Sequence, residues 1–163
     1  MRDTGAAADI GAAENVEDAY RRLRPTLLRL AHLLTGSPEA AEDVVHDTFV
    51  ACSTRWSTLD SPEAYLRRAV VNQARSALRR LGSDRDKAAR YSRHTPVPVG
   101  EPELDDTWAL LRGLPERQRA ALVLRFYEDL SEADIARLLG CRPGTVKSLI
   151  HRGLDKVRKE VLR

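Results

Sequence analysis

Residues 131–152 read SEADIARLLGCRPGTVKSLIHR, which is the pattern of a helix, a short turn and a second helix. Ser131 suits the N-cap of the first helix, and acidic residues follow in its first turn, where the helix dipole favours negative charge. Gly140 tolerates the left-handed backbone that ends a helix, and Pro143 fits the first position of the next one. The stretch therefore predicts a helix-turn-helix, around which the rest of the chain can be placed.

Each helix of this motif has one apolar side. In the first helix the apolar residues recur at helical spacing: Ile135, Leu138 and Leu139. In the second helix Val146, with Leu149 or Ile150, packs back on the first. The remaining outward residues of the second helix form what we call the recognition face: Thr145, Lys147, Ser148, His151 and Arg152. Because a helix-turn-helix lays its second helix in the major groove, this polar and cationic face predicts DNA recognition; the alternative is an ordinary pair of packed helices.

Composition excludes several classes of protein. The chain has 163 residues, of which 31% are charged and 42% hydrophobic, so it can bury a core and stay in solution. No apolar run approaches the ~20 residues that span a bilayer, so we expect no membrane contact. The two cysteines, Cys52 and Cys141, lie far apart. Their spacing favours a reducing cytoplasm over a zinc site or a disulfide framework, and we expect a cytoplasmic protein.

Charge is unevenly distributed along the chain. Residues 1–62 hold 6 Lys and Arg against 10 Asp and Glu, whereas residues 63–100 hold 9 against 3. An acidic front followed by a basic middle suggests one protein-facing surface and other surfaces that face nucleic acid. A solvated charged surface without a partner is the alternative.

Hydrophobic periodicity predicts helices and no strands. In the first half we expect helices over about 16–34, 38–53 and 62–81, with a loop over 54–60; the letters SPEA at 37–40 and again at 61–64 combine a cap, a proline and an acid. Further helices are expected over 104–112 and from Pro115, before the helix-turn-helix. The predicted fold is all-α, with two small helical bundles joined by a flexible linker. Its parts are a disordered tail over 1–15, a first domain over 16–82, a linker over 83–103 and a second domain over 104–163.

Two surfaces of the first domain carry charge of opposite sign. The acidic face is on the outer side of the second predicted helix: Glu39, Glu42, Asp43 and Asp47. The arginine face is on the third: Arg67, Arg68, Asn72, Arg75, Arg79 and Arg80. Trp56 lies in the loop between them. A loop tryptophan can stack on a base that has left the duplex, or it can close the hydrophobic core, and both interpretations stay open.

Together these motifs resemble the RNA polymerase sigma factors of the sigma-70 family, in the extracytoplasmic-function group. Residues 41–49, AEDVVHDTF, look like the group's polymerase-binding helix, and residues 61–72, SPEAYLRRAVVN, look like its promoter-melting helix. In the second domain, LPERQR at 114–119 and the helix-turn-helix are similar to its −35-recognising domain. The sequence departs from the family's common pattern at Ser76, Arg142, Leu149 and Leu154.

The resemblance implies a division of roles. The first domain is expected to bind core RNA polymerase through the acidic face and the −10 element of promoter DNA through Trp56 and the arginine face. The second domain is expected to bind the −35 element through the recognition face. An anti-sigma factor is a common further partner in this family. The resemblance implies no catalytic residue, no cofactor and no metal.

Two other functions remain as alternatives. A stand-alone helix-turn-helix repressor or activator would need a dimer surface or an effector pocket, and the first domain shows no sign of either. A metalloenzyme is suggested by Asp43 and His46, whose i,i+3 spacing is used for metals in helical bundles. Such a site needs a second carboxylate–histidine pair on a facing helix, and His32 has no matching acid near it in the sequence.

Overall fold

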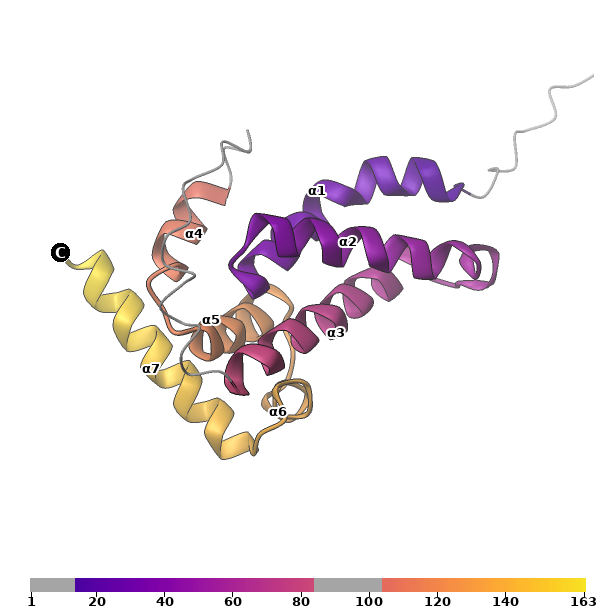
Figure 1. Ribbon diagram of the computed structural model, residues 1–163. Helices are drawn as coiled ribbons and strands as arrows, with labels where there is room; N and C mark the ends of the chain where they lie inside the picture. The colour runs from indigo at the N-terminus through magenta and orange to yellow at the C-terminus, as the bar shows by residue number, and fades with distance from the viewer. Residues whose placement is uncertain (1–13, 84–103) are drawn as a thin grey trace, which may run out of the picture.

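The computed structural model describes residues 14–83 and 104–163. For residues 77–83 and 104–105 it describes the backbone alone. This part of the chain is helical without strands, which confirms the all-α class (Figure 1). The elements are α1 (Val16–Thr35), α2 (Pro38–Ser53), the 3-10 turn η1 (Trp56–Thr58), α3 (Pro62–Ser83), α4 (Leu104–Leu111), α5 (Glu116–Leu122), the π-helical turn η3 (Val123–Tyr127), α6 (Glu132–Leu139) and α7 (Pro143–Val161). The flexibility predicted for the linker and most of the tail falls outside the described residues.

Local capping chemistry sets the ends of the first helices. The Asn15 side chain accepts a hydrogen bond of 2.9 Å from the backbone N–H of Asp18 and caps α1, which continues through Pro25. Gly36, with φ 73°, ends it in the left-handed conformation. One residue later Ser37 caps α2 by accepting from the N–H of Ala40 at 3.2 Å. The predicted start of the second helix is therefore confirmed.

Helices α1, α2 and α3 pack on one another as the first bundle. Their large, fully buried side chains come from all three helices: Leu27, Leu30, Leu34, Val45, Leu66 and Val70. In the same bundle the rings of Tyr20 on α1 and Phe49 on α2 meet edge to face, with centroids 4.7 Å apart. This core fixes which faces of α2 and α3 point outward.

The second bundle is built around α5 and η3. Val123 and Leu124 are buried, so the prediction of a central helix in this region is confirmed, although Phe126 is 63% exposed. At the π turn the N–H of Glu128 donates to the carbonyl of Val123 at 3.1 Å, an i,i+5 bond. Helices α6 and α7 pack on this centre, and α4 lies against α7 (Figure 1).

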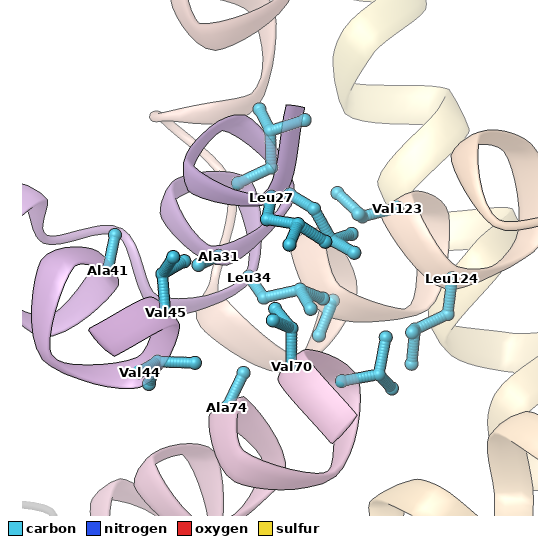
Figure 2. Close-up of a cluster of buried hydrophobic side chains, with 14 of the residues drawn as sticks. Leu27, Ala31, Leu34, Ala41, Val44, Val45, Val70, Ala74, Val123 and Leu124 are labelled. Carbon is cyan, nitrogen blue, oxygen red and sulfur yellow. The ribbon is translucent and has the colours of Figure 1, made fainter. Parts of the chain in front are cut away.

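The two bundles share one hydrophobic core. Val123 and Leu124 from η3 lie in the same cluster as Leu27 and Leu34 from α1 and Val70 from α3 (Figure 2). Helix α5 packs on α1, and α6 packs on α3. The sequence predicts two bundles but contains no signal for this close packing between them.

Candidate nucleic-acid interface

The helix-turn-helix is formed as the sequence predicts. The Ser131 hydroxyl accepts from the N–H of Asp134 at 3.1 Å and caps α6, and Gly140, with φ 62°, ends it. Helix α7 begins at Pro143 after a short turn. Arg142 stands at its N-cap and makes no capping hydrogen bond among the described residues, as expected from the departure at this position. The backbone groups at the start of α7 are thereby left open to solvent or to a ligand.

The recognition face is exposed along α7. All five of its side chains are solvent-accessible, while Val146 between them is fully buried in the hydrophobic core and holds the helix in place. Leu149 and Ile150 are half-buried at the margin. The Ser148 hydroxyl donates to the carbonyl of Gly144 at 3.1 Å, and His151 Nδ1 lies 3.1 Å from a carboxylate oxygen of Asp155. Lys147 and Arg152 make no ion pair within the described part of the chain, so their charges are available to phosphates and base edges.

The acidic face is exposed along α2. Glu42 accepts from Arg24 Nη2 at 2.7 Å through both carboxylate oxygens, and Glu39 accepts from the Ser37 hydroxyl at 2.9 Å. Asp43 and Asp47 are exposed and form no ion pair with any residue that the structure describes. These two carboxylates are thus the part of the acidic face best placed to bind a basic partner.

The arginine face on α3 is only partly accessible. Arg68 and Asn72 are exposed and Arg75 is half-buried, whereas the side chains of Arg79 and Arg80 lie outside the described residues. Arg67 forms a short ion pair with Glu128 of the second bundle. Burial acts to lower the pKa of Arg67, but the hydrogen bond and charge of Glu128 raise it more, so the guanidinium stays charged. One of the expected DNA contacts is therefore occupied by a residue of the same chain.

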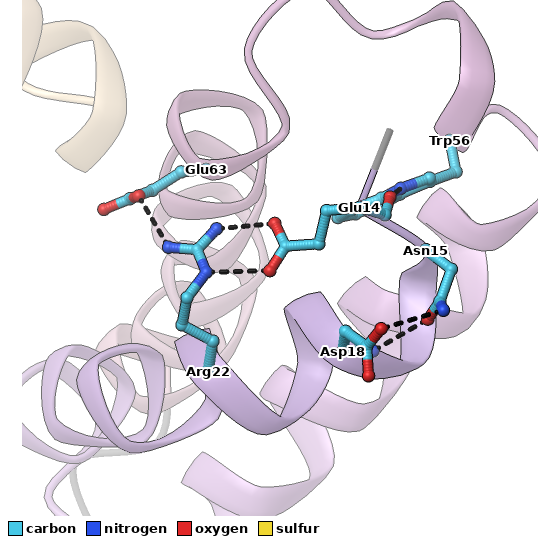
Figure 3. A network of polar contacts seen from close by, with 6 residues as sticks. All are labelled: Glu14, Asn15, Asp18, Arg22, Trp56 and Glu63. Carbon is cyan, nitrogen blue, oxygen red and sulfur yellow. Dashed lines mark hydrogen bonds and ion pairs between the residues drawn. The ribbon is translucent and has the colours of Figure 1, made fainter. Parts of the chain in front are cut away.

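Trp56 lies in η1, half-buried against the core of the first bundle. Its indole Nε1–H donates to the carbonyl of Glu14 at 2.7 Å (Figure 3). The Glu14 carboxylate in turn accepts two hydrogen bonds from Arg22, at 2.8 and 2.7 Å. The hydrogen bonding to Arg22 lowers the pKa of Glu14. These contacts support the interpretation of Trp56 as a side chain that closes the bundle, and they leave base capture as a prediction.

Two arginines of the second bundle donate to backbone carbonyls. Arg117 donates from Nη2 to the carbonyl of Leu139 at 3.0 Å, at the end of α6. Arg125 is half-buried and donates from Nη1 to the carbonyl of Leu130 at 2.9 Å, in the turn before α6. The Leu139 carbonyl is one that α6 itself leaves open at its end.

Sequence reasoning missed the residues that join the two bundles, above all Arg119 and Glu128. Arg119 is only 5% exposed, and burial lowers its pKa while Glu116 opposes that effect. A signal for its burial existed: Leu122 and Val123, three and four residues later, place it on an apolar side of the helix. The helical pattern cannot say which carbonyl the buried guanidinium meets, because that carbonyl belongs to the other bundle.

The described ranges contain neither a membrane-spanning helix nor a metal-binding cluster. Between residues 14 and 83 and between 104 and 163, no helix has the length and apolar character needed to cross a bilayer. The same ranges hold no group of three or more His, Cys, Asp and Glu side chains that could bind a metal ion.

Comparison with known proteins covers almost all of the described chain. Residues 19–83 match the family model of Sigma-70 region 2, and residues 104–157 match that of Sigma-70, region 4. The RNA polymerase sigma-E factor of Streptomyces coelicolor is 30% identical over 94% of this chain and 89% of its own length. The ECF RNA polymerase sigma factor SigM of Mycobacterium tuberculosis is 33% identical over 88% of this chain and 75% of its own.

Among solved structures, the sigma factor RpoE in complex with the anti-sigma factor NepR from Bartonella quintana is similar in fold. It has a TM-score of 0.55 at 24% identity and covers 88% of this chain and 94% of its own. This likeness supports the helical architecture described above.

Proposed function

Because this chain belongs to the sigma-70 family of RNA polymerase sigma factors, in its extracytoplasmic-function group, we propose that its exposed faces divide the work of promoter recognition. The observation that carries this proposal is the exposed recognition face of α7. It lies directly after the turn of the helix-turn-helix, and the buried Val146 fixes its orientation. No residue is assigned a catalytic role. We place the protein in the cytoplasm with the polymerase that it would serve.

The recognition face is proposed to bind the −35 element in the major groove. Residues near the start of a recognition helix approach base edges, whereas residues further along lie closer to phosphates. Lys147 is in the first group and Arg152 in the second. The two charges would therefore have different effects, one on sequence preference and one on general affinity.

The acidic face of α2 is proposed to bind core RNA polymerase. Its carboxylates repel DNA and attract basic groups, so this side of the first bundle suits a protein partner. Asp43 and Asp47 contribute most in this proposal, because Glu42 already pairs with Arg24. An anti-sigma factor, the class of partner in the Bartonella structure, is a further candidate partner.

The arginine face of α3 is proposed to hold the backbone of the −10 element. Arg68, Asn72 and Arg75 supply donors for phosphates, and Arg67 would join them once it leaves Glu128. Trp56 lies at the other end of the same bundle, where stacking on an unpaired base would add to the affinity.

Reconstitution with purified bacterial core RNA polymerase tests this function. We expect added protein to start transcripts at new positions on genomic DNA. Sequencing of the 5′ ends locates these positions, and the DNA upstream of them should share two sequence elements. Core enzyme alone and core enzyme with the Asp43→Arg variant are the matched controls. An unchanged set of transcripts would contradict the proposal. Operator-like DNA binding by a dimer without polymerase would instead favour a conventional helix-turn-helix regulator.

A further inference from the structure

The loop that joins α2 to α3, residues 54–61, is held together by its own hydrogen bonds. The N–H of Thr58 donates to the carbonyl of Arg55 at 2.9 Å, and the N–H of Leu59 donates to the carbonyl of Trp56 at 3.2 Å. Trp56 and Leu59 pack on the core of the first bundle. The exposed tip of the loop consists of three polar residues: Ser57, Thr58 and Asp60. Whatever fixes Trp56 therefore also fixes the direction of this tip.

Trp56 is fixed by a group from outside the loop. The Glu14 carbonyl that accepts its indole N–H lies 42 residues earlier in the chain, and the Glu14 carboxylate is bound by Arg22 (Figure 3). The same guanidinium reaches Glu63 in the first turn of α3, with Nη1 3.5 Å from a carboxylate oxygen. Arg22 thus acts on both ends of the loop, on its start through Glu14 and on its end through Glu63. We call these three residues the loop clamp: Glu14, Arg22 and Glu63.

The backbone that carries the Glu14 carbonyl is itself held in place. Besides capping α1, the Asn15 side chain donates from Nδ2 to the Asp18 carboxylate at 2.9 Å. The Asn15 carbonyl accepts from the N–H of Ala19 at 3.1 Å. These contacts oppose the fraying that is common at helix ends, so the acceptor for Trp56 is a fixed point.

The clamp is exposed to solvent. The side chain of Arg22 is 54% exposed, that of Glu14 37% and that of Glu63 51%. Exposed ion pairs contribute little to global stability, although bidentate geometry and a shared network strengthen them. A loop that can open locally depends on far fewer contacts than the whole fold. Loss of the clamp should therefore change the loop more than it changes the unfolding of the protein.

We propose that Arg22 is a positioning residue for the −10 element: it holds Trp56 through Glu14 and the start of α3 through Glu63, and so directs the loop tip toward promoter DNA. The inference rests on the proposed −10 role of Trp56 and of the arginine face, into which the loop leads. The clamp contains no residue of the recognition face or of the acidic face. Its effect should thus be confined to the −10 side.

Promoter selection by holoenzyme tests the proposal. The DNA is a promoter found in the reconstitution described above, randomised in its −10 element, and the variant is Arg22→Gln. A loop of variable direction discriminates less between bases, so the variant should accept more bases in the selected −10 sequence. If the loop keeps its clamped direction in about a fifth of the molecules, promoter affinity should fall roughly fivefold. A second library, randomised in the −35 element, should yield the same sequence as with the wild type.

Arg21→Gln is the matched control. It removes the same charge at the neighbouring exposed position, where the ion pairs are with Glu17 and Asp18 of α1 itself. It should select both elements as the wild type does. Arg22→Lys keeps the charge but loses the planar donor fork, so its −10 preference should lie between those of the wild type and Arg22→Gln. The urea midpoint should be the same in all three variants.

Tryptophan fluorescence checks the link between Arg22 and Trp56 without polymerase. The chain has two tryptophans, so Trp56 is the only one left in a Trp108→Phe background. There Arg22→Gln should shift the emission to longer wavelength and increase quenching by acrylamide, whereas Arg21→Gln should do neither. Unchanged fluorescence in Arg22→Gln would overturn the proposal.

The outcomes separate this inference from the proposed function. If the wild type starts transcripts at shared promoter elements but Arg22→Gln selects the same −10 sequence, the positioning role is wrong and the sigma function stands. If Arg22→Gln lowers the urea midpoint and relaxes both elements equally, Arg22 has a general structural role and the inference is again wrong. If the wild type starts no new transcripts, the sigma function fails, and altered fluorescence would then show a clamp without a −10 role.

Discussion

Gly153 of α7 lies directly against Leu122 of α5: a Cβ at position 153 would come within 3.0 Å of the Leu122 Cδ1 atom. Both residues are buried, so the absence of a side chain at Gly153 lets the recognition helix approach the central helix closely. The position of α7, and with it the direction of the recognition face, depends on this contact.

Gly153→Ala should therefore destabilise the protein. Overpacking a core costs about 1–3 kcal/mol, and the gain in helix propensity from glycine to alanine offsets roughly 1 kcal/mol of this. We expect a net loss of about 1 kcal/mol in the free energy of unfolding, measured by urea denaturation. Gly144→Ala in the same helix is the control, because no atom lies within 4 Å of its added Cβ. A loss of stability in the control alone would contradict the packing described here.

The acidic face gives a prediction about polymerase binding. Asp43→Arg should abolish binding to core enzyme without changing the helical content. Truncating one partner of a charge pair that binding buries costs ~2–5 kcal/mol, and reversing the charge of Asp43 in the proposed contact with core enzyme should cost at least as much. The matched control is Glu17→Arg, an equal charge change on the exposed first turn of α1. Affinity for core enzyme can be measured by fluorescence anisotropy. Normal affinity in the Asp43 variant would refute the assignment.

His32 predicts a pH dependence of the packing between the two bundles. Its imidazole lies 4.6 Å from the Trp108 ring across the boundary between the bundles. Burial lowers the pKa of His32, the positive charge of Arg119 on α5 lowers it further, and Glu39 on α2 opposes the shift. A lowered histidine pKa means that the packing between the two bundles favours the neutral ring. Its contribution is complete above the ordinary pKa of about 6.5 and is lost as the pH falls through that value.

We therefore expect the radius of gyration to increase when the pH is lowered from 7.5 to 5.5. His32→Gln should remove this increase, since the side chain no longer takes up a proton. His46→Gln, at an exposed position on α2, should retain it. Equal pH responses in the two variants would show that another group controls the packing.

The sequence predicts those parts of the structure that local chemistry determines. Ser37, Ser131 and Gly140 mark helix ends through capping and backbone preferences that act within a few residues, and the structure places them at those ends. The exposure of the recognition face follows from helical pitch in the same way. Burial of Val146 fixes which residues of α7 point outward.

Contacts between distant residues could not be predicted in this way. Arg119 and Leu33 are 86 residues apart, and Arg67 and Glu128 are 61 apart. Neither partner carries a local pattern that names the other, because the pairing depends on how two complete bundles meet. The partial burial of the arginine face is for the same reason a result of the structure and not of the sequence analysis.

The recognition face yields the last prediction, a separation of two effects along α7. Lys147 and Arg152 are both exposed and permanently charged, and they lie more than one helical turn apart. Lys147→Ala should cost ~1–3 kcal/mol and relax the preference at one or two −35 positions, because this part of the helix meets base edges. Arg152→Ala should weaken all promoters alike and lower the salt dependence of log affinity by about one unit, as expected for a phosphate contact.

Promoter selection from a library with a randomised −35 element, by holoenzyme carrying each variant, measures both effects. Leu149→Arg serves as a comparison, since it adds a charge at the half-buried margin and should raise general affinity without changing the selected sequence. If Lys147→Ala leaves both the selected −35 sequence and the affinity unchanged, α7 meets DNA with a different side than the one described. The exposed side chain of Arg142, directly before Pro143, would then be the next to test, because it extends the same surface toward the turn.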